Sequence, residues 1–160
     1  MDTNNIEQKL QEMGLQFPQL PVSKGIYKRC LTVGDFLFVS GHVSVHTDGT
    51  FFTGKVGVNL SEEQGKAAAR QCALGILCSI KDHLGGFDRL KRVVKILGMV
   101  NCHPEFEKQA LIVNGCSELF VKLMGEDNGV GVRSAVGMGS LPGNVAVEVE
   151  ALFELKPGNN

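Results

Sequence analysis

Residues 132–155 read VRSAVGMGSLPGNVAVEVEALFEL, and this stretch decides the fold. In its second half every other residue is apolar, which is typical of a strand with one apolar face. The residues on that face are Val145, Val147, Val149, Ala151 and Phe153. Residues 141–144, Leu-Pro-Gly-Asn, favour a tight type II turn, because proline presets φ and glycine accepts a positive φ. The stretch therefore predicts a two-stranded hairpin.

The register of this hairpin would put Arg133 and Glu148 on one face. If Leu141 faces Asn144, Glu148 lies opposite Gly137, which is about 13 Å from Arg133 at about 3.3 Å per residue. One small ligand could not touch both side chains within a flat hairpin. Two explanations are open: a bulge at residues 138–140 closes the gap, or the two side chains meet partners from different chains.

Composition limits the classes of protein. A chain of 160 residues with 43% hydrophobic content is long enough for one domain with a full core, so we expect residues 1–160 to form a single domain. The net charge is −1, Lys and Arg are scattered, and the chain has one Tyr and no Trp. This composition does not favour nucleic acid as a partner. No apolar run approaches the roughly 20 residues that cross a bilayer, so no membrane association is expected either.

The cysteines indicate the compartment. There are five, an odd number, and none is in a CxxC spacing. This pattern is typical of buried reduced thiols, which favours the cytoplasm or an organelle matrix.

Before the hairpin, we expect four strands. Residues 26–32 and 36–45 flank a Gly-Asp turn, residues 51–56 follow a second turn, and residues 90–100 are rich in β-branched side chains. The first three are close in sequence and predict an antiparallel meander.

Three helices are also expected. A short one carries Ile6, Leu10 and Met13 at helical spacing after Asn4 and Asn5, and it is followed by an extended segment to residue 24. Residues 61–64, Ser-Glu-Glu-Gln, form a capping box for a helix that should end at Gly85. The third runs from about residue 106 to 124, and residues 156–160 should be a frayed tail.

This order of elements predicts an α+β two-layer sandwich, with a mixed β-sheet and two main helices on one face. The other face of the sheet also carries many small or apolar residues. Self-association is the natural way to cover it.

Several short motifs occur in a fixed order along the chain. They are Tyr27 in GIY, Ser40 and Gly41 in FVSGHV, Asn114 in IVNG, Arg133 and Ser134 in VRSAV, and Leu141 and Pro142 before VEVEA. In this order the chain resembles the YjgF family, also called RidA or the reactive intermediate deaminases, whose older label is L-PSP endoribonuclease. The resemblance extends from about Tyr27 almost to the end. Because an N-terminal helix precedes it and residues 40–114 are extended in length, the chain looks similar to a longer subgroup.

The resemblance implies a chorismate-mutase-like fold and a homotrimer with three clefts between subunits. It also implies hydrolysis of enamines and imines, such as 2-aminoacrylate, to 2-oxo acids and ammonia. Arg133 matches the arginine that binds the substrate carboxylate. Glu148 would orient or deprotonate a water molecule, while Tyr27, Ser40 and Asn114 would bind the polar edge of the substrate. This chemistry requires no metal or cofactor.

One position departs from the family pattern. Deaminating members often carry a cysteine two residues after the arginine, and here that residue is Ala135. A thiol role is excluded, although the backbone of Ala135 could still contact the substrate. A non-catalytic module that binds a small carboxylate metabolite is therefore an alternative function, and an L-PSP-type endoribonuclease is a third.

Plain structural roles are open for the same residues. Arg133 could pair with Glu150 or Glu154 at the surface, and Asn114 could face solvent in its helix. His42 and His46 are four residues apart, a spacing that does not converge on a zinc ion when a turn follows a strand.

Overall fold

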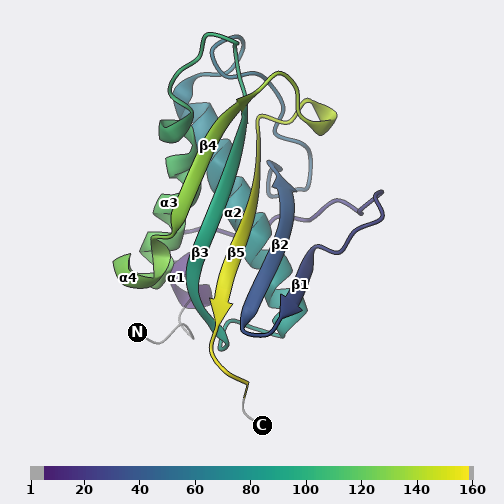
Figure 1. The fold of residues 1–160 in the computed structure, drawn as a ribbon. Coiled ribbons are helices and arrows are strands. Elements are labelled where there is room, and N and C mark those ends of the chain that lie inside the picture. The colour runs from purple at the N-terminus through teal and green to yellow at the C-terminus, as the bar shows by residue number, and fades with distance from the viewer. Residues whose placement is uncertain (1–5, 159–160) are drawn as a thin grey trace.

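The computed structural model describes residues 6–158, which form a five-stranded mixed sheet with two long helices on one face (Figure 1). The strands, in their order across the sheet, are β1 (Cys30–Val33), β2 (Phe36–Val43), β5 (Val147–Leu155), β3 (Leu90–Asn101) and β4 (Val132–Met138). The helices are α1 (Ile6–Glu12), α2 (Glu62–Leu84), α3 (Gln109–Met124), the short α4 (Glu126–Gly129) and the 3-10 turn η2 (Pro142–Asn144). The predicted α+β two-layer fold is confirmed.

The predicted hairpin of residues 132–155 is wrong. β3 lies between β4 and β5, so that Met99 pairs with Val136 on one side and with Glu148 on the other. β4 is parallel to β3 because α3 connects them, and parallel strands require such a crossover. The chain then turns at η2, with φ 63° at Gly143, and passes beyond β3 to reach β5.

The predicted strands differ in length from the observed ones. β2 and β3 lie almost where expected, but only the last part of the predicted strand at residues 26–32 belongs to β1. The side chains of Val22 and Ile26 are 87% and 109% exposed, because the segment before β1 extends away from the sheet (Figure 1). Residues 51–56 form isolated bridges instead of a strand. Of the expected meander, the β1–β2 pair is observed, the second pair is reduced to an antiparallel bridge between Val45 and Phe51, and β2 pairs next with β5.

The long helices begin and end for identifiable reasons. Ser61 accepts a hydrogen bond from the Gln64 amide at 3.2 Å, and Gln64 accepts one from the Ser61 amide at 2.9 Å, so the capping box is confirmed. Gly85, at φ 76°, ends α2 as predicted. α3 begins at Gln109, slightly later than expected, because residues 103–108, which include Pro104, form a loop. None of the helices within residues 6–158 combines the length and apolarity needed to cross a bilayer.

The N-terminal helix α1 also lies where its pattern predicts. Ile6 and Leu10 are buried in the core, and Gly14 follows the helix with φ 66°. Asn4 and Asn5, expected to precede this helix, lie outside the described residues. At the other end, the Lys156 amide donates to the Arg89 carbonyl at 2.7 Å, so the expected tail is held at its first residue.

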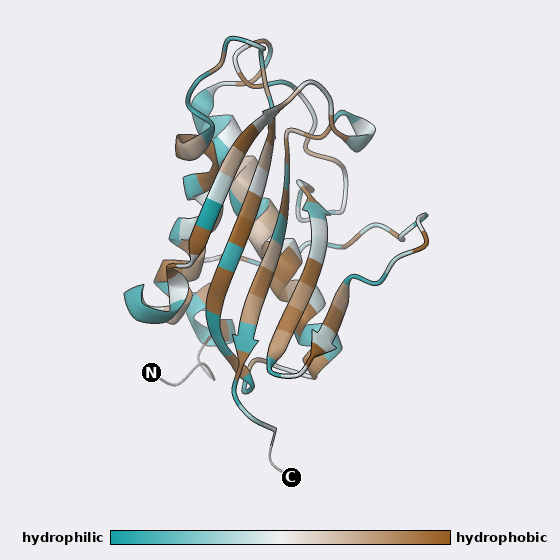
Figure 2. Cartoon of the chain, viewed as in Figure 1, coloured by the Kyte–Doolittle hydropathy of each residue, from teal (hydrophilic) through white to brown (hydrophobic). Residues whose placement is uncertain are grey.

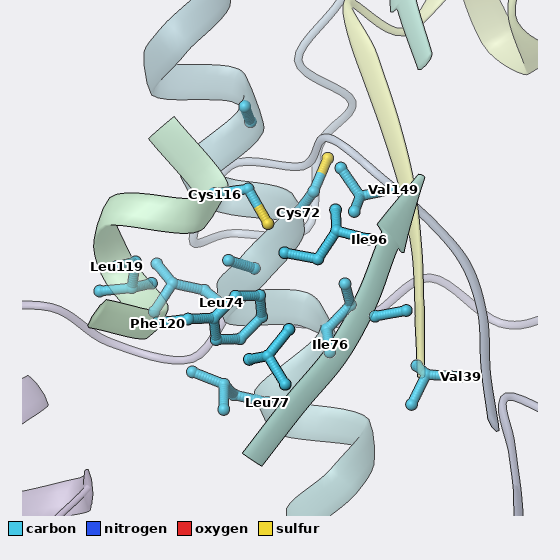
Figure 3. Close-up of a cluster of buried hydrophobic side chains, with 14 of the residues drawn as sticks. Val39, Cys72, Leu74, Ile76, Leu77, Ile96, Cys116, Leu119, Phe120 and Val149 are labelled. Atoms are coloured by element: carbon cyan, nitrogen blue, oxygen red, sulfur yellow. The ribbon is translucent and has the colours of Figure 1, made fainter. Parts of the chain in front are cut away.

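The core lies between the two long helices and the sheet (Figure 3). There the rings of Phe120 on α3 and Phe153 on β5 meet edge to face, with centroids 5.5 Å apart. Cys72 and Cys116 are buried in the same layer, and all five cysteines are free thiols. The opposite face of the sheet, here called the open face, has no helix over it and carries apolar side chains (Figure 2). Its exposed apolar residues include Leu31, Val33, Phe36, Phe38, Val132 and Val136.

Candidate functional site

Arg133 lies on β4, at the edge of the sheet, and faces α3. It pairs with Ile96, whose side chain is buried under the helices. Its Nη1 donates to Asn114 Oδ1 at 2.8 Å and to Ser117 Oγ at 3.0 Å, and its Nη2 donates to the Ala110 carbonyl at 3.3 Å. Of the five donors of a guanidinium, one on Nε and one on Nη2 then have no acceptor within the described part of the chain. The group is fixed and can still bind an anion.

Local sequence explains this arrangement. Ala110, Asn114 and Ser117 are four and three residues apart, so they line one face of α3. Asn114 is therefore not the solvent-facing residue that propensity alone allowed. Ala135 follows Arg133 on the same face of β4, and its side chain packs against the core. We call Arg133, Asn114, Ser117 and Ala135 the arginine half-site.

A second group of predicted residues lies near the end of β2. Glu148 pairs with Val43, and its carboxylate rests on Gly41, where a Cβ would collide with Glu148 Oε1. Burial, and secondarily the charge of Glu150, raise the pKa of Glu148 above its ordinary value. A carboxylate with a raised pKa accepts a proton more readily.

Ser40 and Tyr27 complete this second group. The Ser40 hydroxyl donates to the Lys28 carbonyl at 2.6 Å, which leaves its oxygen available as an acceptor. Tyr27 is 53% exposed in the segment before β1. We call Tyr27, Ser40, Gly41 and Glu148 the glutamate half-site.

The two half-sites do not meet within one chain. Arg133 points to the helices, whereas Glu148, opposite Met99, points to the open face. Two strand spacings, or about 10 Å, separate their strands, and their positions along the sheet differ by a further three residues. The prediction that Arg133 and Glu148 share a face is therefore wrong. It failed because it assumed that β4 and β5 are neighbours.

His42 holds the backbone of the glutamate half-site. Its Nδ1 donates to the Ser40 carbonyl at 2.7 Å, and its Nε2 lies 2.7 Å from Ser79 Oγ on α2. Because a carbonyl only accepts, Nδ1 carries the proton and Nε2 accepts from the hydroxyl. The register of β2 shifts between Val39 and His42, so this residue ties a bulge to the helix beneath it. Burial lowers the pKa of His42 to about 4.

The plain alternatives for the charged residues do not hold. Glu154 accepts from Lys91 at 2.6 Å and from Arg92 at 3.2 Å, and Glu150 is exposed on the open face, away from Arg133. The ring of His46 stacks on Phe52, with centroids 4.5 Å apart, and does not approach His42 as a zinc pair would require.

Sequence reasoning missed several residues of the site. Ser117 and Ala110 could have been found from their helical spacing to Asn114. No local sequence pattern predicts the close contact of Gly41 with Glu148 or the hydrogen bond between His42 and Ser79, because each of them joins distant parts of the chain.

The comparison with known proteins identifies the family. Residues 7–153 match the family described as "YjgF/chorismate_mutase-like, putative endoribonuclease". The chain belongs to the YjgF/RidA family. Protein TCP17 of Trypanosoma cruzi is 38% identical over 153 residues, which is 96% of each chain. The family includes deaminases.

Solved structures agree with the chorismate-mutase-like fold. Atu1372 of Agrobacterium tumefaciens, described as of unknown function, is 36% identical, covers 97% of this chain and 96% of its own, and superimposes with a TM-score of 0.86. RidA from the Antarctic bacterium Psychrobacter sp. PAMC 21119 is 22% identical over 87% of this chain and 98% of its own, with a TM-score of 0.56. It therefore shares the fold, while Atu1372 is more similar in structure.

Proposed function

We propose that this protein hydrolyses reactive imines and enamines to 2-oxo acids and ammonia, in clefts between subunits. The observation that carries the proposal is the guanidinium of Arg133, fixed by three acceptors on α3 with two donors left over, in a member of a family that includes deaminases. A carboxylate takes two such N–H donors in parallel, and lysine offers no equivalent geometry.

The chemistry needs little beyond position and one base. With its carboxylate on Arg133, the imine carbon is fixed relative to one water molecule. Glu148 accepts a proton from that water, which attacks the carbon of the C=N bond. That proton passes to the nitrogen and gives a neutral carbinolamine. The carbinolamine hydroxyl then loses its proton, the amine gains one, the C–N bond breaks, and ammonia and the 2-oxo acid are released. An enamine first takes a proton on its terminal carbon to become the imine.

The remaining polar residues suit the rest of the substrate. The amide nitrogen of Asn114 can donate to a substrate oxygen, because its Oδ1 already accepts from Arg133. The Ser40 oxygen can accept from the imine nitrogen, and the Tyr27 hydroxyl can close the site from the segment before β1. Ala135 would contribute only its backbone.

This proposal requires an assembly of at least two chains, and RidA family proteins typically form homotrimers. Arg133 and Glu148 point to opposite faces of one sheet, so both can reach one small molecule only if each comes from a different chain. The open face supports this assembly, because its exposed apolar side chains are a suitable surface for another subunit.

Non-catalytic binding of a small carboxylate metabolite is the second candidate. It is favoured by Ala135, which stands where deaminating relatives often carry a cysteine. An endoribonuclease, as in the description of the family, is less well supported, because the net charge is −1 and the chain has few aromatic residues. A salt-sensitive affinity for RNA would favour that third function.

The first test is an imine hydrolysis assay. Imines are generated from amino acids by an amino-acid oxidase, and semicarbazide captures what remains. We expect wild type to accelerate imine loss and Arg133→Ala to abolish the acceleration. Arg70→Ala is the matched control, because Arg70 is an exposed arginine on α2, away from both half-sites. No acceleration by wild type with any amino acid would favour the binding function instead.

A further inference from the structure

A cavity of about 480 Å³ lies beside the glutamate half-site. The segment before β1, the last residues of β2 and the turn η2 gather around it on one side of the molecule (Figure 1). Its apolar walls are Leu20, Pro21, Val22, Val43, Phe51 and Pro142. Tyr27, Gly41 and His42 also line it, so the cavity is continuous with residues that we assign to the site.

The cavity approaches the Glu148 carboxylate, which does not itself line it. Gly41 lies against that carboxylate, and Val43 is its partner across the β2–β5 pair, and both residues line the cavity. A 2-imino acid whose carboxylate is bound by the Arg133 guanidinium and whose C=N carbon is attacked by water at Glu148 has one substituent left, its side chain. That substituent therefore lies at the opening of this cavity.

The part of the wall at Leu20 and Pro21 is held in place by contacts within the chain. Arg29 donates to the Pro21 carbonyl through Nη2, and the Gln19 amide donates to the Thr47 carbonyl at 3.0 Å. A Cβ at Gly75 would lie 3.4 Å from Leu20 Cδ2, which shows that Leu20 packs on α2. A preformed cavity costs little ordering entropy when a ligand enters.

The chemistry of the lining selects the class of side chain. No carboxylate lines the cavity, and its charged residues are Lys24 and Arg29, of which Arg29 is bound to Pro21. Its volume lies within the range of about 300–1,000 Å³ that holds small organic ligands. The single terminal carbon of 2-aminoacrylate would leave nearly all of it unfilled.

We propose that this cavity is the side-chain subsite of the reaction, and that it takes the uncharged apolar side chain of a 2-imino acid between leucine and phenylalanine in size. This inference rests on the proposed function, because it takes Arg133 and Glu148 as the groups that hold and hydrolyse the substrate. The cavity itself is observed independently of that function. Most of one wall comes from residues 20–24, which precede the stretch that carries the family motifs.

The test compares imines of four amino acids: alanine, leucine, phenylalanine and aspartate. We expect kcat/KM for the leucine and phenylalanine imines to exceed that for the alanine imine by about tenfold or more, because one methylene in an apolar pocket is worth about that much. The aspartate imine should be slower than the leucine and phenylalanine imines, because the walls are mostly apolar and two of the polar side chains on them, Arg29 and His42, already have hydrogen-bond partners. Equal or faster turnover of the alanine or aspartate imine would overturn the subsite and leave the proposed function standing.

Two variants tie this preference to the cavity. Val43→Phe fills it, and should lower the ratio of kcat/KM for phenylalanine imine to that for alanine imine by about tenfold. Phe51→Ala removes an aromatic wall that is 45% exposed, so folding should tolerate it, and should lower the same ratio. Val58→Phe, at an exposed position away from the cavity, should leave the ratio unchanged. A ratio unaffected by both cavity variants would also overturn the subsite.

A binding measurement tests the side-chain subsite independently of turnover. Calorimetry with the product acids should give tighter binding of phenylpyruvate than of pyruvate to wild type, and Val43→Phe should reduce the difference. This result would support the subsite even if no imine were hydrolysed. Equal affinity for the two acids would remove it, whatever the activity.

Discussion

His42 shows how one buried side chain fixes a backbone that carries candidate site residues. Both ring nitrogens are hydrogen-bonded, one to the Ser40 carbonyl and one to Ser79 on α2. The residue between the two anchored positions is Gly41, on which the carboxylate of Glu148 rests. The ring therefore positions Glu148 through the backbone. Burial disfavours a positive charge on the ring, which explains why its pKa is lowered to about 4.

This lowered pKa predicts a pH-dependent stability. Below pH 6.5 the unfolded chain binds a proton at His42 that the folded protein does not bind until about pH 4. The contribution of the neutral ring is thus complete above pH 6.5 and is lost as the pH falls towards 4. At pH 4.5 the loss should be about 2 kcal/mol of unfolding free energy. Urea unfolding at pH 7 and pH 4.5 measures it.

His42→Gln is the matched control, because glutamine can bond both partners but does not titrate. The variant should lose less stability than wild type between the two pH values, and carboxylates titrate alike in both proteins. An identical loss would show that the ring is not the group responsible.

At the scale of elements, local sequence patterns predicted most of the helices and strands, but they did not predict which strands pair. The capping box of α2, the β-branched run of β3 and the alternation of β5 are signals within one segment, and all three elements lie where expected. The prediction of a hairpin failed because β5 could pair with either β3 or β4. Which of the two lies beside β5 depends on the side of β3 at which the chain re-enters the sheet after α3. The motifs identified Arg133 and Asn114 through the family resemblance, but their contact requires β4 to lie under α3.

The contact between α2 and α3 gives a testable prediction at the scale of elements. Gly115 lies against the backbone of α2, where a Cβ would collide with the Lys66 carbonyl. Gly115→Ala should force the helices apart and lower the unfolding free energy by about 1 to 3 kcal/mol, despite the better helix propensity of alanine. Chemical denaturation measures this change.

Gly75→Ala is the comparison for that variant, because Gly75 is also inside a long helix but a Cβ added there would make only ordinary van der Waals contacts. This variant should be neutral or more stable by up to about 1 kcal/mol. If both variants behaved alike, the close approach at Gly115 would not be the cause.

At the scale of the whole molecule, the proposed function makes the two half-sites parts of an assembly. Each chain carries the arginine half-site at one edge of its sheet and the glutamate half-site on the open face, near the end of β2. A complete cleft therefore needs one half-site from each of two chains. This geometry distinguishes an inter-subunit site from a site in which both residues act within one chain.

Mixed oligomers test that distinction. Arg133→Ala and Glu148→Gln should each be inactive as pure proteins. When the two are coexpressed with different tags and purified through both, some clefts combine an intact Arg133 with an intact Glu148. Every doubly purified trimer contains both kinds of chain, so one of its three clefts combines them in the right order and the fraction is about one third. Imine hydrolysis should recover to about this share of the wild-type rate.

The control mixture pairs Arg133→Ala with Asn114→Ala. Both changes fall in the arginine half-site, where Asn114 holds Arg133 at 2.8 Å, so no chain supplies an intact copy and no recovery is expected. Recovery in this control would mean that Asn114 is dispensable. Doubly purified oligomers of the first pair that stay inactive would mean that the clefts are not built from one arginine half-site and one glutamate half-site. Arg133 and Glu148 would then be needed on the same chain.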